Sequence, residues 1–188
     1  RECERDRAAA ARVQAQLQSH GYRCIQGDAR ATGLPDACAS VVYGEAMLTM
    51  QMEDQKRAII AEAARLLRPG GRYAIHEICF EGGTEESRRE ACRDLTRQIH
   101  HGVQPLPVGE WTRLFEEAGF TVARVRTVPM HLLEPARLLR DEGLIGTLRF
   151  VLWLMLNPAA RRRAAEMRAT FRRHSGLIRG MSIVAVRN

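Results

Sequence analysis

The chain has 188 residues and a formal net charge of +7, with 45% hydrophobic and 27% charged residues. This length and composition predict a globular domain with its own apolar core and exclude a disordered or fibrous chain. No apolar run reaches the roughly 20 residues that a membrane span requires. The five cysteines include no CxxC or CxxH pair. They therefore predict free thiols in a reducing cytosol, without a metal site.

Helical and extended segments alternate along the first half of the chain. In order, the pattern predicts a helix at 4–19, strands at 22–26 and 39–43, a helix at 54–67 and a strand at 72–79. Pro69 and the two glycines after it prevent the second helix from continuing. Such alternation predicts an α/β fold, in which a doubly wound, mostly parallel sheet carries helices on both faces. The strands are short and apolar, as expected for strands covered on both sides.

The second half of the chain contains more helix. Its predicted elements are helices at 84–101, 110–118, 132–140, 144–156 and 158–174, and strands at 120–128 and 181–187. Thr84 is a good N-cap for the first of these helices, and two glutamates follow in its first turn. Trp111 and Trp153 are expected to anchor packing. No repeat or linker divides the chain, so we expect residues 1–188 to form a single domain.

Acidic residues accompany three of the predicted strands. Asp28 follows the first strand, Glu45 follows the second, and Glu77 lies within the third. In doubly wound sheets, ligands bind outside the carboxyl ends of the strands. A carboxylate there can accept hydrogen bonds from hydroxyls, amines or an adenine amino group. The alternative stays open that Asp28 only starts a turn and Glu45 only caps a helix.

Four segments, in register, resemble the middle of class I (Rossmann-like) S-adenosylmethionine-dependent methyltransferases. They are residues 26–29 (QGDA), 34–36 (LPD), 39–42 (ASVV) and 62–72 (EAARLLRPGGR). The resemblance covers about residues 4–80, and residues 110–128 and the last strand resemble later parts of the same fold. It implies methyl transfer as the activity and S-adenosyl-L-methionine as the cofactor.

The resemblance also implies which residues hold the cofactor. Asp28 would accept a hydrogen bond from the adenine amino group, with the backbone of Ala29 beside it. Glu4, or Glu2 in its place, would pair with the ribose hydroxyls. Glu45 and its two neighbours would lie near the methionine part and the transferring methyl. The full implied set is Glu4, Asp28, Ala29, Gly44, Glu45 and Ala46.

The glycine-rich loop that follows the first strand of this family has no counterpart in the printed sequence. We expect the first strand, this loop and most of the second strand to precede Arg1, which would make the domain N-terminally incomplete. The alternative is a non-catalytic binding or regulatory protein built on a methyltransferase-like scaffold.

Three histidines are candidate general bases. Transfer of an already activated methyl group depends mainly on alignment. A base is needed only for a hydroxyl or protonated amine acceptor. The candidates are His76, His101 and His131. His76, in a strand, could equally be a packed core residue. Cys79 and Cys92 could bind a soft metalloid such as arsenite, or could simply pack as small apolar residues.

Two stretches, 84–108 and 130–180, are predicted to be helical cap insertions, the second placed before the last strand. Long insertions in compact domains are usually functional. In the resembled family they cover the acceptor, so the apolar run at 144–156 implies a small, apolar or aromatic metabolite as substrate. The alternative is that this run packs in the core or in a homodimer.

The helix at 158–174 is rich in arginine. It could face nucleic acid or an anionic membrane surface. However, Glu166 interrupts it, and arginine supplies all but one of the basic residues of the whole chain. A solvated helix face in an arginine-biased proteome gives the same pattern, so no nucleic-acid partner is expected.

Overall fold

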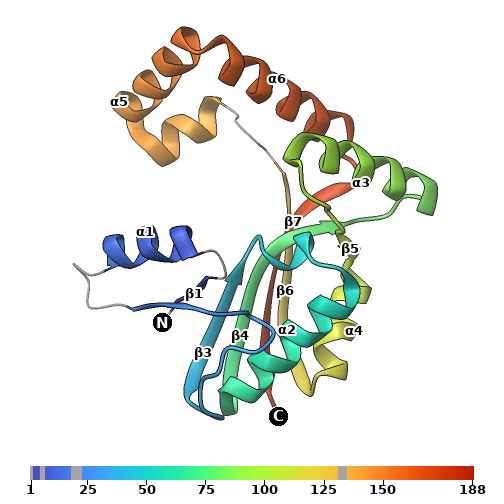
Figure 1. Ribbon diagram of the computed structural model, residues 1–188. Coiled ribbons are helices and arrows are strands. Elements are labelled where there is room, and N and C mark those ends of the chain that lie inside the picture. The colour runs from blue at the N-terminus through green and yellow to red at the C-terminus, as the bar shows by residue number, and fades with distance from the viewer. Residues whose placement is uncertain (1, 5–6, 18–22, 131–134) are drawn as a thin grey trace.

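The computed structural model describes residues 2–4, 7–17, 23–130 and 135–188 (Figure 1). The strands are β1 (Glu2–Glu4), β2 (Cys24–Gln26), β3 (Ala39–Glu45), β4 (Leu67–Phe80), β5 (Leu106–Pro107), β6 (Phe120–Pro129) and β7 (Ile178–Arg187). The helices are α1 (Arg7–Leu17), α2 (Glu53–Leu66), α3 (Glu85–Ile99), α4 (Val108–Glu117), α5 (Pro135–Leu156) and α6 (Pro158–Arg173), with a 3₁₀ turn, η2, at Leu48–Met50.

The main sheet has the strand order β3-β4-β7-β6, and β5 adds a short pairing at the end of β4. β3 and β4 run parallel, with Glu45 opposite His76. β7 runs antiparallel to both β4 and β6. β1 and β2 form a separate parallel pair. The predicted α/β, doubly wound class is therefore confirmed, and the last strand lies between β4 and β6, antiparallel to both.

The predicted helix at 4–19 is wrong at its start. Glu2–Glu4 form β1, with Glu4 opposite Gln26 of β2, and α1 begins only at Arg7. Helix propensity summed over so few residues is a weak signal. The backbone hydrogen bonds that β1 exchanges with β2 outweigh it, and these bonds join residues far apart in the sequence.

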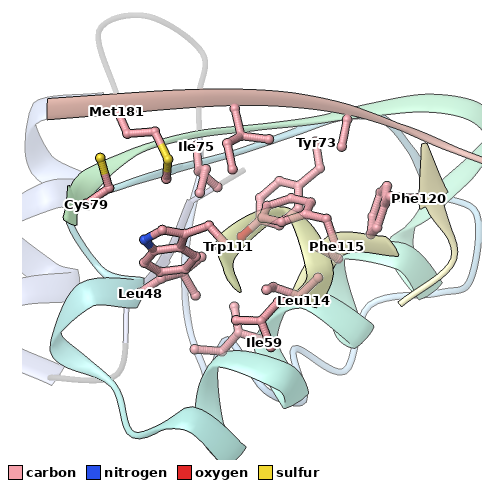
Figure 2. Close-up of a cluster of buried hydrophobic side chains, with 14 of the residues drawn as sticks. Leu48, Ile59, Tyr73, Ile75, Cys79, Trp111, Leu114, Phe115, Phe120 and Met181 are labelled. Carbon is pink, nitrogen blue, oxygen red and sulfur yellow. The ribbon is translucent and has the colours of Figure 1, made fainter. Parts of the chain in front are cut away.

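The main core lies between the sheet and helices α2 and α4 (Figure 2). Tyr73 of β4 is its centre, because the ring of Phe115 lies 5.3 Å and that of Phe120 lies 6.0 Å from it. Trp111 is fully buried, and its indole N–H donates to the carbonyl of Ile78 at 3.3 Å. The expected packing role of Trp111 is confirmed, and this core fixes α4 against β4.

A second, smaller core joins α3 and α6 to the end of β4. Phe80 packs there with Leu95 of α3 and Phe171 of α6. The predicted N-cap of α3 is confirmed, since the Thr84 hydroxyl accepts a hydrogen bond from the backbone N–H of Ser87 at 3.2 Å. In Figure 1, α3, α5 and α6 all lie toward the carboxyl ends of β3 and β4.

Helix α5 consists of two helical segments that meet at Gly143, whose φ of 68° is left-handed. This break confirms the predicted division into two helices. The expected packing role of Trp153 is wrong, because this side chain is 51% exposed and stacks on Phe150. None of the described helices could cross a membrane alone. Only residues 142–156 and 158–173 taken together have the length and apolar composition of a membrane span, and a bend of 111° separates them.

Replacing Phe115 by alanine should lower the free energy of unfolding by about 3–5 kcal/mol, since it removes a fully buried ring and leaves a cavity. Denaturant unfolding followed by circular dichroism measures this change. The control is Arg113→Ala, at an exposed position of the same helix, which should shift stability by no more than about 0.5 kcal/mol. Equal effects of the two changes would contradict the described core.

Candidate functional site

The carboxyl ends of β3 and β4 bring together Tyr43, Glu45 and His76. The phenol of Tyr43 donates to Glu45 Oε2 at 3.0 Å, and His76 Nδ1 lies 3.5 Å from Glu45 Oε1. Each of the three side chains is at least half exposed. Desolvation, followed by the hydrogen bond to Glu45, raises the pKa of Tyr43. His76 is thus exposed, and a predicted cofactor residue lies beside a predicted base.

The turn after β3 has a special backbone. Ala46 has a φ of 50°, in the left-handed region that residues with a Cβ rarely adopt. Its N–H donates to the carbonyl of His76 at 2.9 Å, which ties the turn to β4. Gly44 is buried, and a Cβ there would lie 3.5 Å from both Met47 Sδ and the Tyr73 hydroxyl. The predicted segment Gly44–Ala46 therefore consists of the end of β3 and the first residue of the turn, which is bonded to β4.

Glu77 holds the residues that follow this turn. Its carboxylate, 3% exposed, accepts from the backbone N–H groups of Met47, Leu48 and Thr49 at 2.9, 2.7 and 3.1 Å. The hydroxyl of Thr49 adds a fourth hydrogen bond at 2.6 Å. A buried carboxylate is tolerated when several donors satisfy it. Glu77 therefore organises the site without facing it, a role that sequence reasoning missed.

Lys56 was missed as well. It is fully buried, donates to the carbonyl of Gln51 at 2.6 Å, and lies 5.7 Å from the centre of the Trp111 ring. Burial lowers the pKa of Lys56 to about 8, and the charge of Glu77 opposes this shift. Lys56 thus links the start of α2 to α4. Its signal in the sequence was that it is the sole lysine in an arginine-rich chain.

Asp28 lies in a tight turn after β2. Its carboxylate accepts from the backbone N–H of Arg30 at 2.9 Å and pairs with the Arg30 guanidinium at 2.6 Å. Ala29 packs against the main core. Asp28 thus stabilises a turn, which was one of the two roles that the sequence left open for it, and its carboxylate remains partly exposed.

The segment after Asp28 is anchored to α2 through Glu62. The carboxylate of Glu62 accepts from the N–H and hydroxyl of Thr32 at 2.8 and 2.6 Å. Hydrogen bonds from Arg65 are the main cause that lowers the pKa of Glu62 to about 2. This network fixes the path between β2 and β3.

The other predicted site residues lie apart from Glu45. Glu4 ends β1, so its backbone stands at the carboxyl end of a strand. His101 follows α3, is exposed, and makes a local contact of 3.2 Å with the carbonyl of His100. His131 lies outside the described residues. His76 is therefore the candidate base that the described structure brings to Glu45.

The cysteines do not support a metalloid site. Burial raises the pKa of Cys79 to about 11 and also raises that of Cys92, so both favour the neutral thiol. Thiolates, rather than thiols, bind soft metals. Within the described ranges, no group of three or more histidine, cysteine or acidic side chains could hold a metal ion.

An open pocket of about 960 Å³ lies between α3 and residues 102–107. Phe80, Val103 and Leu106 contribute apolar surface, and four arginines of α3 line its rim. The backbone N–H of Gln104 donates to the carbonyl of Thr49 at 2.7 Å, which joins this wall to the segment held by Glu77. The pocket thus adjoins the carboxyl end of the sheet.

Replacing Glu77 by glutamine should destabilise the protein by about 1–3 kcal/mol, because the new amide NH₂ cannot accept from the donors of Met47–Thr49. Glu45→Gln, at an exposed carboxylate one strand away, should stay within about 0.5 kcal/mol of the parent. Thermal and denaturant unfolding measure both changes. A neutral Glu77→Gln variant would contradict the role of this carboxylate.

Lys56 predicts a pH dependence of stability. Its folded pKa of about 8 lies below the ordinary value of 10.5, so between these pH values the unfolded chain binds more protons than the folded chain. Stability from this group therefore rises with pH across that window, by at most about 3 kcal/mol. Denaturant unfolding of the parent and of Lys56→Met at pH 7–10.5 measures it. The free energy of unfolding of the parent should rise with pH relative to that of Lys56→Met. A difference between the two proteins that does not depend on pH would contradict the prediction.

Comparisons with known proteins agree with this arrangement. Residues 2–75 match a family model described as a methyltransferase domain. Over 150 residues the chain is 32% identical to an uncharacterised protein of Haemophilus influenzae; the match covers 78% of this chain and 59% of that protein. The chain thus spans less than two thirds of this relative.

Two solved structures share the fold at low sequence identity. The crystal structure of MccD protein superposes with a TM-score of 0.73 at 13% identity, covering 99% of this chain and 78% of that one. A geranyl diphosphate methyltransferase in complex with S-adenosylmethionine superposes with a TM-score of 0.66 at 14% identity, covering 99% and 67%. The match of residues 2–75 to a methyltransferase domain and the shared fold agree with the resemblance to class I, Rossmann-like methyltransferases.

Proposed function

We propose that this chain acts in an S-adenosyl-L-methionine-dependent methyltransferase whose substrate is a small, apolar or aromatic metabolite. The observation that carries the proposal is the end of β3, where Glu45 lies beside His76, Ala46 is bonded to β4, and Glu77 holds the residues that follow. A methyl transferase works mainly by alignment, and alignment requires a preorganised site.

The chemistry of the residues present fits the cofactor. Glu4 ends β1 and Asp28 lies in the turn after β2, the strand parallel to it, where a carboxylate can accept from ribose hydroxyls or from an adenine amino group. Both oxygens of Asp28 bond to Arg30, so an adenine amino group there would share this carboxylate with the guanidinium. Glu45 and the adjoining backbone would line the methionine part. When bound, the cofactor supplies a methyl group already activated by its sulfonium.

His76 is the proposed base for a hydroxyl or amine acceptor. It is exposed, so its ring can reach a substrate, and Glu45 lies 3.5 Å from its Nδ1. A carboxylate at this distance can orient the imidazole ring toward an acceptor. The register of β3 and β4 fixes both residues relative to each other.

We further propose that another parallel strand, from residues outside the printed sequence, lies between β1 and β3. The outer edge of β3 is unpaired among the described strands. Val41 and Tyr43 are 61% and 60% exposed, although this strand is largely apolar. A strand in this position would join β1 and β2 to the main sheet and bring Glu4 and Asp28 toward Glu45. Its turn would be the place for the family's glycine-rich loop.

The proposed acceptor site lies under the segments 84–108 and 130–180. The pocket beside α3 adjoins the segment that Glu77 holds, and Phe80, Val103 and Leu106 give it apolar surface. This lining supports an apolar or aromatic small molecule. The free thiols of Cys24, Cys38, Cys79 and Cys92 support action in the reducing cytosol.

Calorimetry with S-adenosylhomocysteine tests the cofactor. The longest encoded chain that contains these residues should bind it, and Asp28→Ala should weaken binding by about tenfold to a hundredfold, because a hydrogen bond to a charged group is lost. The matched control, Glu116→Ala, removes an exposed carboxylate of α4 and should bind like the parent.

His76→Ala separates catalysis from binding. In a screen of small apolar acceptors, it should lower kcat for hydroxyl or amine acceptors while leaving the affinity for S-adenosylhomocysteine unchanged. An intact chain that binds no S-adenosylhomocysteine would instead support the non-catalytic scaffold.

A further inference from the structure

The second segment of α5 is an apolar helix that is exposed on most of its surface. Ile145 is 76% exposed and Leu156 is 74% exposed. The other large apolar side chains of this segment that remain exposed are Leu144, Leu148, Val151, Leu152, Trp153 and Met155. A helix that is apolar all round is normally buried in a protein or in lipid. The described chain covers little of this one.

The position of α5 explains this exposure. Its main packing partner is α6, and α5 stands away from the sheet, whereas the far end of α6 packs against α3 (Figure 1). Arg149 is the sole charged residue within 144–156. Trp153 stacks on Phe150 with 6.3 Å between the ring centres. A helix with so little charge is suited to an apolar phase, and Arg149 can extend its guanidinium to the polar boundary of that phase.

Positive charge follows this apolar helix. The exposed residues 161–163, all arginine, come one turn after its end, whereas the exposed Arg140 before it is followed by Asp141 and the exposed Glu142. Helix α6 adds the exposed Arg172 and Arg173 and has one acidic residue, Glu166. Arginines at the border of an apolar surface complement the negative headgroups of an anionic leaflet.

We propose that residues 142–163 bind the surface of an anionic phospholipid bilayer, with the apolar side chains of α5 in the interface and the arginines on the headgroups. The segment 144–156 is about 20 Å long, too short for a hydrocarbon core of about 30 Å. The bend of 111° before α6 also favours lying on the bilayer over crossing it. The net charge of +7 on each chain disfavours a second copy as the occupant.

Vesicle sedimentation tests this binding with the whole chain. The protein should sediment with vesicles of equal parts phosphatidylcholine and phosphatidylglycerol, but only weakly with pure phosphatidylcholine. Trp153 fluorescence should shift to the blue on binding, and Trp153→Phe should lose that shift. Changing residues 161–163 to glutamine should reduce partitioning about a hundredfold, since each basic residue near such a surface contributes about fivefold.

Exposed apolar positions provide a matched pair of variants. Leu148→Glu with Leu152→Glu should abolish vesicle binding without unfolding the protein, because both side chains are exposed. Val128→Glu alters an equally exposed apolar residue of β6 and should leave binding unchanged. Vesicle binding needs no methyl transfer, so its failure leaves the cofactor measurements untouched.

Two outcomes would overturn the membrane proposal. The first is equal sedimentation with and without the anionic lipid. The second is a stable dimer, detected by ultracentrifugation, that the glutamate variants dissociate. That result would show that a second copy covers α5.

Discussion

The buried carboxylate of Glu77 is the constraint on which the rest of the site depends. It gathers four hydrogen bonds from Met47–Thr49, and a carboxylate this deep in the protein is stable only with such partners. The same contacts fix the chain just after β3, so Ala46 can be held in a left-handed conformation. Because Glu77 belongs to β4, the turn is positioned relative to the strand that carries His76.

Rigidity at this end of the sheet continues into the core. Lys56 joins the residues after η2 to α4 through Gln51 and the ring of Trp111, and Trp111 in turn binds the carbonyl of Ile78. The polar groups around the turn after β3 are therefore held by hydrogen bonds to neighbouring elements. Residues on this frame lie where a reaction governed by alignment would need them. Among the described residues, α5 packs mainly on α6 and has no comparable network to the sheet, which agrees with a role in contacting something else.

Local signals predicted most of the fold. The apolar runs of β3 and β4, the N-cap at Thr84 and the division between the helices predicted at 132–140 and 144–156 are each short-range features, and each is present. Glu4 was misassigned to the first helix, because the pairing of β1 with β2 is a contact between distant residues. The contacts of Glu77 and Lys56 were out of reach for the same reason. Sequence placed Glu45 and His76 on neighbouring strands, but only the register of β3 and β4 places them 3.5 Å apart.

The open edge of β3 and the exposed surface of α5 share one property, which is that the described chain does not cover them. Each is apolar, and apolar surface of this extent is seldom left in water. For β3, the unpaired backbone edge calls for another strand, since only a strand satisfies a row of N–H and carbonyl groups together with Val41 and Tyr43. For α5, the backbone is already satisfied within the helix, so a fluid apolar phase serves as well as a protein surface. The flanking arginines then favour a negatively charged bilayer over another positively charged copy of this chain.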